Sequence, residues 1–245
     1  MSVAVVSDVH GSLAALEAVV ADLTRRAPDA VVCGGDLALM GGQPAEVVGR
    51  IRELGWPTVV GNTDEVLWAP DEHERQLRRA PKLRPLLDLI FEEYAPATRA
   101  RLAPADLDWL RGLPPEVRVG DVLVLHAGPG DLWRAPMADA PDEELRAVYG
   151  GCSARTVVYG HIHQPFVRDL DGLVVANSGS AGLSWDGDPR ASYVLVQEGG
   201  AQIVRVAYDV ERDAAALHAT GYPDAARLAE MRRRARFLPV GWRPE

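Results

Sequence analysis

Residues 3–10 have the sequence VAVVSDVH, a short apolar run followed by a polar turn. The run Val3–Val6 has the length and the β-branched composition of a buried strand. Ser12 follows the turn and can cap a helix. The apolar positions after it have helical spacing: Leu13, Leu16, Val20 and Leu23. The stretch therefore predicts a strand, a turn that carries Asp8 and His10, and a helix.

The same order of elements continues along the chain. Ala30–Cys33 and Thr58–Val60 are predicted strands, and the helix Pro44–Leu54 between them has Pro at its start and Gly55 as its stop. This β-α-β-α-β rhythm indicates parallel strands with crossover helices. Residues 65–113 differ, because prolines divide an Arg-, Glu- and Leu-rich stretch into short helical pieces. We interpret this stretch as a helical insertion.

The second half is predicted to be mostly β. Its expected strands are Glu116–Val119, Val122–Leu125, Thr156–Tyr159, Phe166–Leu170, Leu173–Ala176, Tyr193–Val196 and Ile203–Val206. Two helices, within about residues 209–237, end the chain at Val210–His218 and Pro223–Phe237. The order favours one α/β domain over residues 1–245, with two sheets sandwiched between helices.

The length and charge of the chain exclude some classes of protein function. The chain has 245 residues and a formal net charge of −9. It lacks both a signal peptide and an apolar run near the roughly 18 residues that span a bilayer, so we expect a cytoplasmic protein. The acidic balance disfavours tight binding of duplex nucleic acid, which depends on Lys and Arg. The basic run Arg232–Arg236 is predicted to be a solvated helix face, and Cys33 a buried, inert thiol.

Residues able to bind metals follow five of the predicted strands. They are Asp8 and His10, Asp36, Asn62, His126, and the pair His161 and His163. Ligands of open α/β sheets bind outside the carboxyl ends of strands, so we expect these side chains to share one site. Each motif alone is weak, but their conjunction is specific.

The chemistry of these residues suggests the ions. Carboxylate, imidazole and amide oxygen without thiolate suit Mn²⁺, Fe, Co²⁺, Ni²⁺ or Zn²⁺, and we favour manganese. Seven ligands are too many for one ion but suit two divalent ions with a shared carboxylate. Two such ions can hold a phosphoryl group and activate a water between them.

In this order the residues resemble the calcineurin-like metallophosphoesterase superfamily, whose motifs are D-x-H, G-D, G-N-H-[DE], H and G-H-x-H. The resemblance covers residues 1 to about 197. It implies a four-layer αββα sandwich of two mixed sheets flanked by helices. It also implies that Asp8, His10 and His163 hold one metal, that Asn62, His126 and His161 hold the other, and that Asp36 bridges them. The resemblance implies that a hydroxide between the metals attacks phosphorus in line with the leaving oxygen, with Asp36, Asn62 and His126 as the catalytic residues.

One position departs from the family pattern. Thr63 stands where the third motif usually has a histidine that contacts the phosphate or protonates the leaving group. The chain therefore resembles the small bacterial and archaeal branch with G-N-C-D or G-N-T-D, whose members tend to cleave phosphodiesters. A hydroxyl can bind phosphate but is a poor proton donor. Either the leaving group needs little protonation, or an acid such as His73 comes from elsewhere.

Other residues are candidates for contact with the substrate. Arg134 follows the His126 motif and can pair with phosphate. Ser178 lies in Asn177-Ser178-Gly179-Ser180, which resembles a segment of the same branch. With Thr63, these make the predicted substrate-binding set.

The leading hypothesis is an enzyme that hydrolyses a small phosphodiester. A phosphomonoesterase and a non-catalytic metal-binding scaffold are the alternatives. A nuclease or protein phosphatase is disfavoured by the acidic charge and by Thr63. The natural substrate stays open among cyclic nucleotides, dinucleotides and glycerophosphodiesters, and the insertion is either a lid or the surface of a homo-oligomer.

Overall fold

The computed structural model describes residues 1–243, which form two mixed sheets. The first has the order β2-β1-β8-β9. In it β1 (Val3–Val6) pairs in parallel with β2 (Ala30–Cys33) and antiparallel with β8 (Ala191–Gln197), which is followed by β9 (Gly200–Val206). Helices α1 (Leu13–Arg26) and α2 (Pro44–Leu54) follow β1 and β2.

The second sheet has the order β3-β4-β5-β7-β6. Its strands are β3 (Glu116–Val119), β4 (Val122–Leu125), β5 (Thr156–Tyr159), β6 (Phe166–Asp169) and β7 (Val174–Asn177). The central strands β4, β5 and β7 run parallel to one another, while β3 and β6 at the edges are antiparallel to their neighbours.

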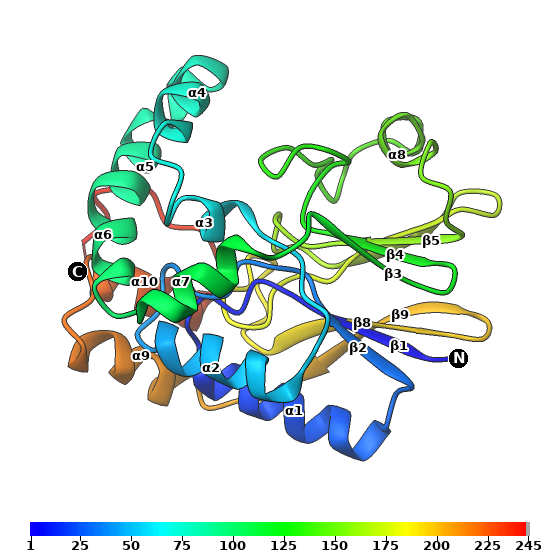
Figure 1. Cartoon of the computed structure of the whole chain (residues 1–245), viewed down its shortest axis with the longest axis horizontal. Helices are drawn as coiled ribbons and strands as arrows, with labels where there is room; N and C mark the ends of the chain where they lie inside the picture. Colours follow the sequence, from blue (N-terminus) through cyan, green and yellow to red (C-terminus); the bar gives the residue numbers. More distant parts are fainter. Residues whose placement is uncertain (244–245) are drawn as a thin grey trace.

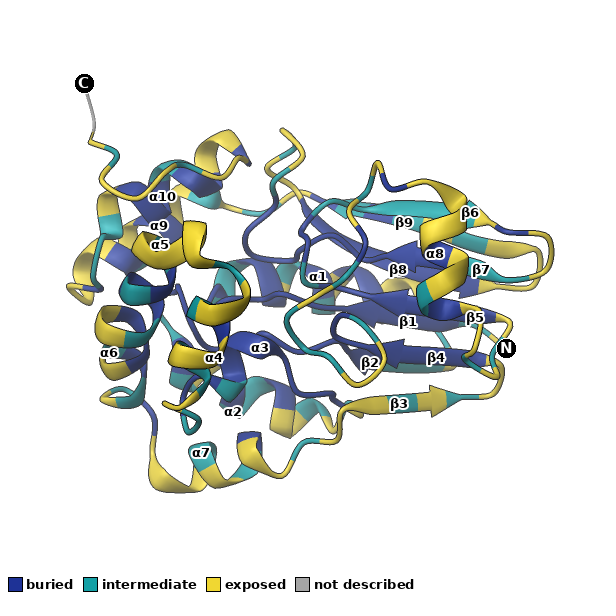
Figure 2. Cartoon of the chain, turned by 90° about the horizontal axis from the view of Figure 1, so that it is seen from above, coloured by how far each residue is buried: buried dark blue, intermediate teal, exposed yellow. Residues whose placement is uncertain are grey.

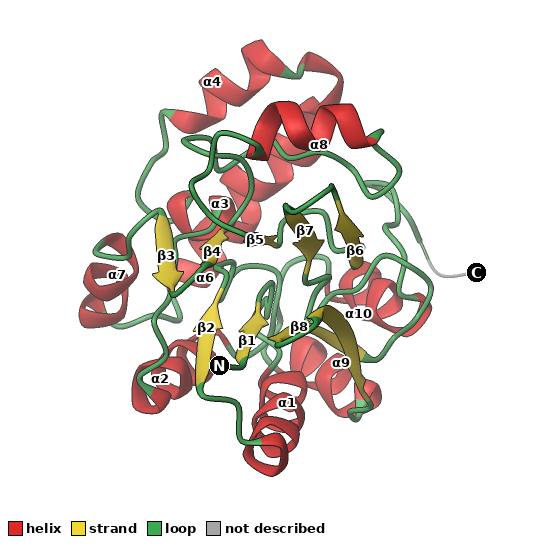
Figure 3. Cartoon of the chain, turned by 90° about the vertical axis from the view of Figure 1, so that its right-hand side faces the viewer, coloured by secondary structure: helices red, strands yellow, loops and turns green. Residues whose placement is uncertain are grey.

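The sheets stack face to face, with helices on both outer sides (Figure 3). Successive side chains of a strand point to opposite faces, so Val3 and Val5 enter the core between the sheets, while Ala4 and Val6 join the core under the helices. All four are buried because both faces of the sheet are covered. This arrangement confirms the predicted αββα sandwich.

The outer face of the second sheet is covered by a helix that was not predicted from the sequence. Helix α8 (Asp142–Tyr149) buries Leu145 and Tyr149 against a third apolar cluster, which includes Leu123 and Tyr159. These two apolar positions are one helical turn apart, which was the available signal. The strand expected at Thr58–Val60 is reduced to a single bridge between Thr58 and Cys33, and the Val60 N–H donates to the Pro114 oxygen at 2.9 Å.

Residues between β2 and β3 form the expected helical pieces. After α3 (Asn62–Glu65) come α4 (Glu72–Arg79), a 3₁₀ turn η1 (Pro81–Leu83), α5 (Arg84–Asp88), a π-helical turn η2 (Leu89–Tyr94), α6 (Ala95–Arg99) and α7 (Pro104–Arg111). Figure 1 shows α4, α5 and α6 stacked along one side of the molecule. Figure 2 shows α4 and α5 mostly exposed, in contrast to the central strands.

Two helices end the chain, α9 (Val210–Ala219) and α10 (Ala225–Arg234). The expectation that Arg232–Arg236 forms a solvated face is wrong for Arg232, whose side chain is 0% exposed. Its guanidinium pairs with Asp213 and donates to the backbone oxygens of His10 and Met40 at 3.0 and 2.9 Å. Within residues 1–243, no helix has the length and apolar composition that crossing a membrane requires.

Candidate metal centre

The predicted ligands meet where four strands of the two sheets end. Asp8 and His10 follow β1, Asp36 follows β2, His126 follows β4, and His161 and His163 follow β5, while Asn62 begins α3. Backbone hydrogen bonds hold the loops together, from the Asp8 N–H to the Gly35 oxygen and from the His10 N–H to the Asp36 oxygen, both at 3.0 Å. The site therefore straddles both sheets.

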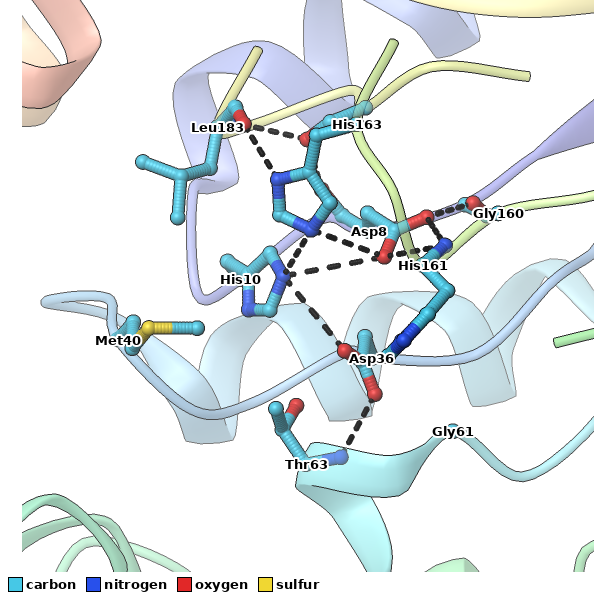
Figure 4. A network of polar contacts seen from close by, with 12 residues as sticks. Asp8, His10, Asp36, Met40, Gly61, Thr63, Gly160, His161, His163 and Leu183 are labelled. Carbon is cyan, nitrogen blue, oxygen red and sulfur yellow. Dashed lines mark hydrogen bonds and ion pairs between the residues drawn. The ribbon is translucent and has the colours of Figure 1, made fainter. Parts of the chain in front are cut away.

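Four of these side chains form a compact, buried group: Asp8, His10, Asp36 and His163 (Figure 4). Each offers one ligand atom, and these atoms lie within 4.8 Å of one another. His163 Nε2 is 3.2 Å from Asp8 Oδ1 and 3.2 Å from His10 Nε2. His10 Nε2 is 3.7 Å from Asp36 Oδ2. The group has the size and ligand types of a single divalent-ion site.

The remaining ligand candidates gather on the other side of Asp36. Asn62 Oδ1 lies 2.9 Å from His126 Nε2 and 2.9 Å from His161 Nδ1. The second carboxylate oxygen of Asp36, Oδ1, is 3.5 Å from His126 Nε2. Asp36 thus directs one oxygen toward each group.

Hydrogen bonds to backbone oxygens determine how three of the imidazoles are protonated. The Nδ1 atoms of His10, His126 and His163 lie 2.9, 2.9 and 2.6 Å from the carbonyl oxygens of Leu39, Gly34 and Leu183. A carbonyl can only accept, so Nδ1 carries the hydrogen and Nε2 of the neutral ring presents a lone pair. With both rings neutral, the facing Nε2 atoms of His10 and His163 would repel each other and Asp8 unless a proton or a metal cation lay among them. This donor set fits a metal ion.

Burial keeps two of the histidines neutral. It lowers the pKa of His10 to about 3, and the nearby His163 adds to the effect. It also lowers the pKa of His161 to about 3, helped by His126. For His126 burial opposes the charged form, but Asp36 and Asp8 outweigh it and raise the pKa. Neutral imidazole is the form that binds metals.

The pKa values of the Asp8 and Asp36 carboxyl groups shift in opposite directions. Burial would raise the pKa of Asp8, but the charge and hydrogen bond of His163 bring it below its usual value. Burial raises the pKa of Asp36, and together with the charge of Asp8 it outweighs the opposing effect of His126. Two buried carboxylates this close to one another destabilise each other's ionised form when no cation lies between them. A bound cation would favour the ionised form of both.

The backbone of the site is held in an uncommon conformation. Asp8, His10, Asp36, His161 and His163 have φ angles between 48° and 67°, in the left-handed region. Few residues other than glycine adopt this region, although Asn, Asp and His do so more often than the rest, and such residues concentrate at functional sites. Hydrogen bonds from the N–H groups of Asp8 and His10 to the loop after β2 hold two of these residues in place.

One residue that supports the site was given no role by the sequence pattern. The buried Asp64 carboxylate accepts the N–H groups of Asp36, Leu37 and Gly61 at 2.8, 2.9 and 3.1 Å. It therefore joins the loop after β2 to the loop before α3. Burial, followed by the charge of Asp36, raises the pKa of Asp64 to about 7. The only sequence signal was its place in Gly-Asn-Thr-Asp.

Residues 1–199 match the model of a protein family described as the calcineurin-like phosphoesterase superfamily domain. The chain belongs to this family. An uncharacterised protein of Methanocaldococcus jannaschii is 29% identical over 237 residues, covering 86% of this chain and 89% of that protein.

Two solved structures share the fold. A metallophosphoesterase from Sphaerobacter thermophilus is 24% identical with a TM-score of 0.76, covering 96% of this chain and 100% of that one. A hypothetical protein from Pyrococcus horikoshii OT3 is 17% identical with a TM-score of 0.71, covering 95% and 96%. The predicted family is confirmed. Membership of this family supports a hydrolase, and the buried Asp and His cluster could hold the metal on which the family depends.

The structure places the predicted substrate-binding residues of this phosphoesterase in different positions. Thr63 donates its N–H to Asp36 Oδ1 at 2.9 Å, and its buried hydroxyl finds no hydrogen-bond partner within residues 1–243. Arg134 is exposed and lines the cavity at the metal ligands. Ser178 lies behind the site, where its Oγ is 3.0 Å from Ser7 Oγ, which in turn hydrogen-bonds Asp8.

His73, the alternative acid, lies in α4, where it stacks on Phe91 and has its Nε2 2.9 Å from Asp88. It does not line the cavity at the metal ligands, among the described residues. That cavity has a volume of about 420 Å³. Its floor includes His10, Asp36, Asn62, Thr63, His161 and His163.

Proposed function

We propose that this protein is a phosphodiesterase with a dinuclear metal centre. Asp8, His10 and His163 would hold one ion, and Asn62, His126 and His161 the other. The observation that carries the proposal is the position of Asp36, whose Oδ2 faces His10 at 3.7 Å and whose Oδ1 faces His126 at 3.5 Å. A carboxylate between two ligand groups is what a shared pair of ions requires.

Bound ions would supply an activated water and neutralise charge on the phosphoryl group. The chain's own residues would bind and orient the substrate. The Thr63 hydroxyl is free to donate to a phosphate oxygen, and Arg134 can pair with another. The backbone contacts of the imidazoles hold their ring orientations before any substrate arrives.

Charge and proton donors favour a diester over a monoester. Of the arginines that line the cavity, Arg79 pairs with Asp131 and Arg227 with Asp224, whereas Arg134 has no carboxylate partner within residues 1–243. One free cation matches the single charge of a phosphodiester better than the double charge of a monoester. Thr63 is also a poor acid, which suits a leaving group that needs little protonation.

Manganese is the ion that we propose for both positions, with iron, nickel, cobalt and zinc as alternatives. The ligand atoms are nitrogen and oxygen, and the thiol of the nearby Cys33 is kept protonated because burial raises its pKa to about 12. Hard and borderline ligands without thiolate suit these ions.

The test is cleavage of bis(p-nitrophenyl) phosphate against p-nitrophenyl phosphate with Mn²⁺, Ni²⁺, Co²⁺, Zn²⁺ or Mg²⁺. We expect faster cleavage of the diester and bound metal close to two ions per chain. Asp36→Ala and His161→Ala should lose at least 100-fold in kcat/KM, whereas His218→Ala, an exposed position on α9, should match the wild type. Full activity in both site variants would exclude the proposed centre. Bound metal without cleavage would instead favour a scaffold.

A further inference from the structure

The cavity at the metal ligands has walls of hydrocarbon. On the side of the insertion they consist of Leu83, Leu86, Leu87 and Ile90, from η1, α5 and η2. Met231 of α10 and Phe237 after it contribute from the C-terminal region. These residues belong to two parts of the chain far apart in sequence, so the wall is produced by tertiary packing.

Exposed apolar side chains gather at the same place. Across residues 1–243, the large apolar residues that are exposed are Met1, Leu83, Met137, Phe237 and Val240. Leu83, Met137 and Phe237, which are 49%, 49% and 43% exposed, all line this cavity. They come from the insertion, the loop after β4 and the segment after α10. An apolar rim around an apolar cavity marks a ligand site.

Apart from Arg134, which we assign to the phosphate, the polar side chains on the walls already have partners. Gln76 donates to Glu72 at 3.1 Å, Arg79 pairs with Asp131, and Arg227 donates to the Leu238 oxygen and the Tyr94 hydroxyl, both at 2.7 Å. Little polar capacity therefore remains on these walls to recognise the edge of a nucleobase.

Groups without partners lie at the metal end instead. The buried Thr63 hydroxyl and the buried Trp185 Nε1 have none within residues 1–243. Thr63 adjoins Asp36, and the Trp185 ring stacks on His163 with 4.0 Å between ring centres. The cavity is thus polar where a phosphate would sit and apolar beyond it.

We propose that the substrate is an amphiphilic phosphodiester, in which the phosphate binds at the metal ligands and an alkyl chain occupies the apolar cavity. The identity of the phosphate end rests on the proposed function, whereas the alkyl end rests on the cavity itself. Leu83, Leu87, Met137 and Phe237 determine specificity. Removing the chain from water is the source of affinity, and about 420 Å³ accommodates several methylene groups beside the head group.

The test measures binding of methyl-, butyl- and octylphosphonate, which carry no ester to hydrolyse, to the manganese-loaded protein. Emission of Trp133 and Trp185, which both line the cavity, reports binding. Each buried methylene should tighten binding about three- to fourfold, so octylphosphonate should bind on the order of 100-fold more tightly than butylphosphonate. The p-nitrophenyl esters of the same phosphonates should show the same trend in kcat/KM.

Leu83→Glu and Met137→Glu place a charge on the rim from two separate elements and should remove most of the gain from butyl to octyl. Val240→Glu makes the same change at an exposed apolar residue that does not line the cavity. This variant should keep the gain in affinity from butyl- to octylphosphonate. Equal binding of butyl- and octylphosphonate, tighter binding of a nucleoside phosphonate, or an unchanged gain in both rim variants would overturn the proposal. Tight octylphosphonate binding without ester cleavage would support the cavity while contradicting the proposed function.

Discussion

Thr63 carries a buried hydroxyl without a hydrogen-bond partner in the described chain. Leaving such a group unpaired costs about 1 kcal/mol or more. Thr63→Val keeps the shape and removes the hydroxyl, so we expect the metal-free protein to gain about 1 kcal/mol in unfolding free energy. We also expect kcat/KM for a phosphodiester to fall roughly 10- to 100-fold, because a hydrogen bond to a charged phosphate is lost.

Thr98 provides the matched control, because its buried hydroxyl lies 2.8 Å from that of Tyr222. Thr98→Val should lose about 1 kcal/mol of stability and keep activity. Denaturant unfolding and initial rates check both variants. Lower stability together with unchanged activity in Thr63→Val would contradict the assigned role.

Gly160 is required for the close approach of two loops. A Cβ there would lie 2.2 Å from Asp8 Oδ2 and 2.2 Å from Ser7 Oγ. Gly160→Ala should therefore destabilise the protein by about 1–3 kcal/mol and weaken metal binding, as measured by calorimetric titration. A Cβ added at Gly49 in α2 would meet no atom within 4 Å, so Gly49→Ala should add about 0.5–1 kcal/mol and leave metal affinity unchanged. Wild-type metal affinity in Gly160→Ala would show that the loops can move apart.

At the scale of residues, the sequence predicts the types of ligand at the site but not the backbone conformation of the residues that carry them. The candidates at strand ends could be recognised because Asp, His and Asn recur after apolar runs. The left-handed conformation of Asp8, Asp36 and His161 could not, because hydrogen bonds from distant segments maintain it. The contacts of Asp64 were equally hidden, since its three N–H partners come from two loops.

Helix α10 is tied to the metal loop through Arg232. Arg232→Met leaves Asp213, which is 1% exposed, as an unpaired buried carboxylate. It also removes the hydrogen-bond donor to the backbone oxygens of His10 and Met40. We expect a loss of about 3–5 kcal/mol in unfolding free energy together with weaker metal binding. Arg234→Met, at a side chain 55% exposed and paired with Glu230, should change stability by less than about 1 kcal/mol. Thermal unfolding of both variants decides, and equal effects would refute the coupling.

At the scale of elements, most strands could be predicted to within a residue or two. The central strands β1, β4 and β5 are short, mostly apolar runs with both faces covered, whereas the edge strand β3 alternates charged and apolar residues. The segment Thr58–Val60 has the same composition, yet only Thr58 pairs. Composition cannot tell whether a neighbouring strand is within reach. Arg232 was misjudged for a similar reason, since a run of arginines gives no sign that one of them meets a buried Asp213.

Metal loading is expected to stabilise the whole molecule, because ions bind the folded chain and not the unfolded one. At a free Mn²⁺ concentration about 100 times the dissociation constant, the unfolding free energy should rise by about 2.7 kcal/mol. For a chain of this length that corresponds to a rise in Tm of roughly 5–10 °C. Calorimetry with and without EDTA measures it, with Asp8→Ala as the variant that should respond less. An identical Tm in both conditions would argue against a metal site.

The overall architecture could be predicted from the order of elements and from the family resemblance. The position of the insertion could not. The insertion meets α10 through a hydrogen bond from the Arg227 guanidinium to the Tyr94 hydroxyl at 2.7 Å. Sequence patterns predict the insertion and α10 separately, but they do not predict that the two pack against each other.

The two sheets are joined to one another at the metal centre by residues distant along the chain, since His10 and His163 are 153 positions apart. An ion held by both would act as a reversible cross-link that encloses most of the polypeptide. Unlike a disulfide, which persists in the unfolded chain, the ion would be released on unfolding and would stabilise the folded chain alone. Metal supply would then govern how long each molecule survives proteolysis, in addition to whether it turns over substrate.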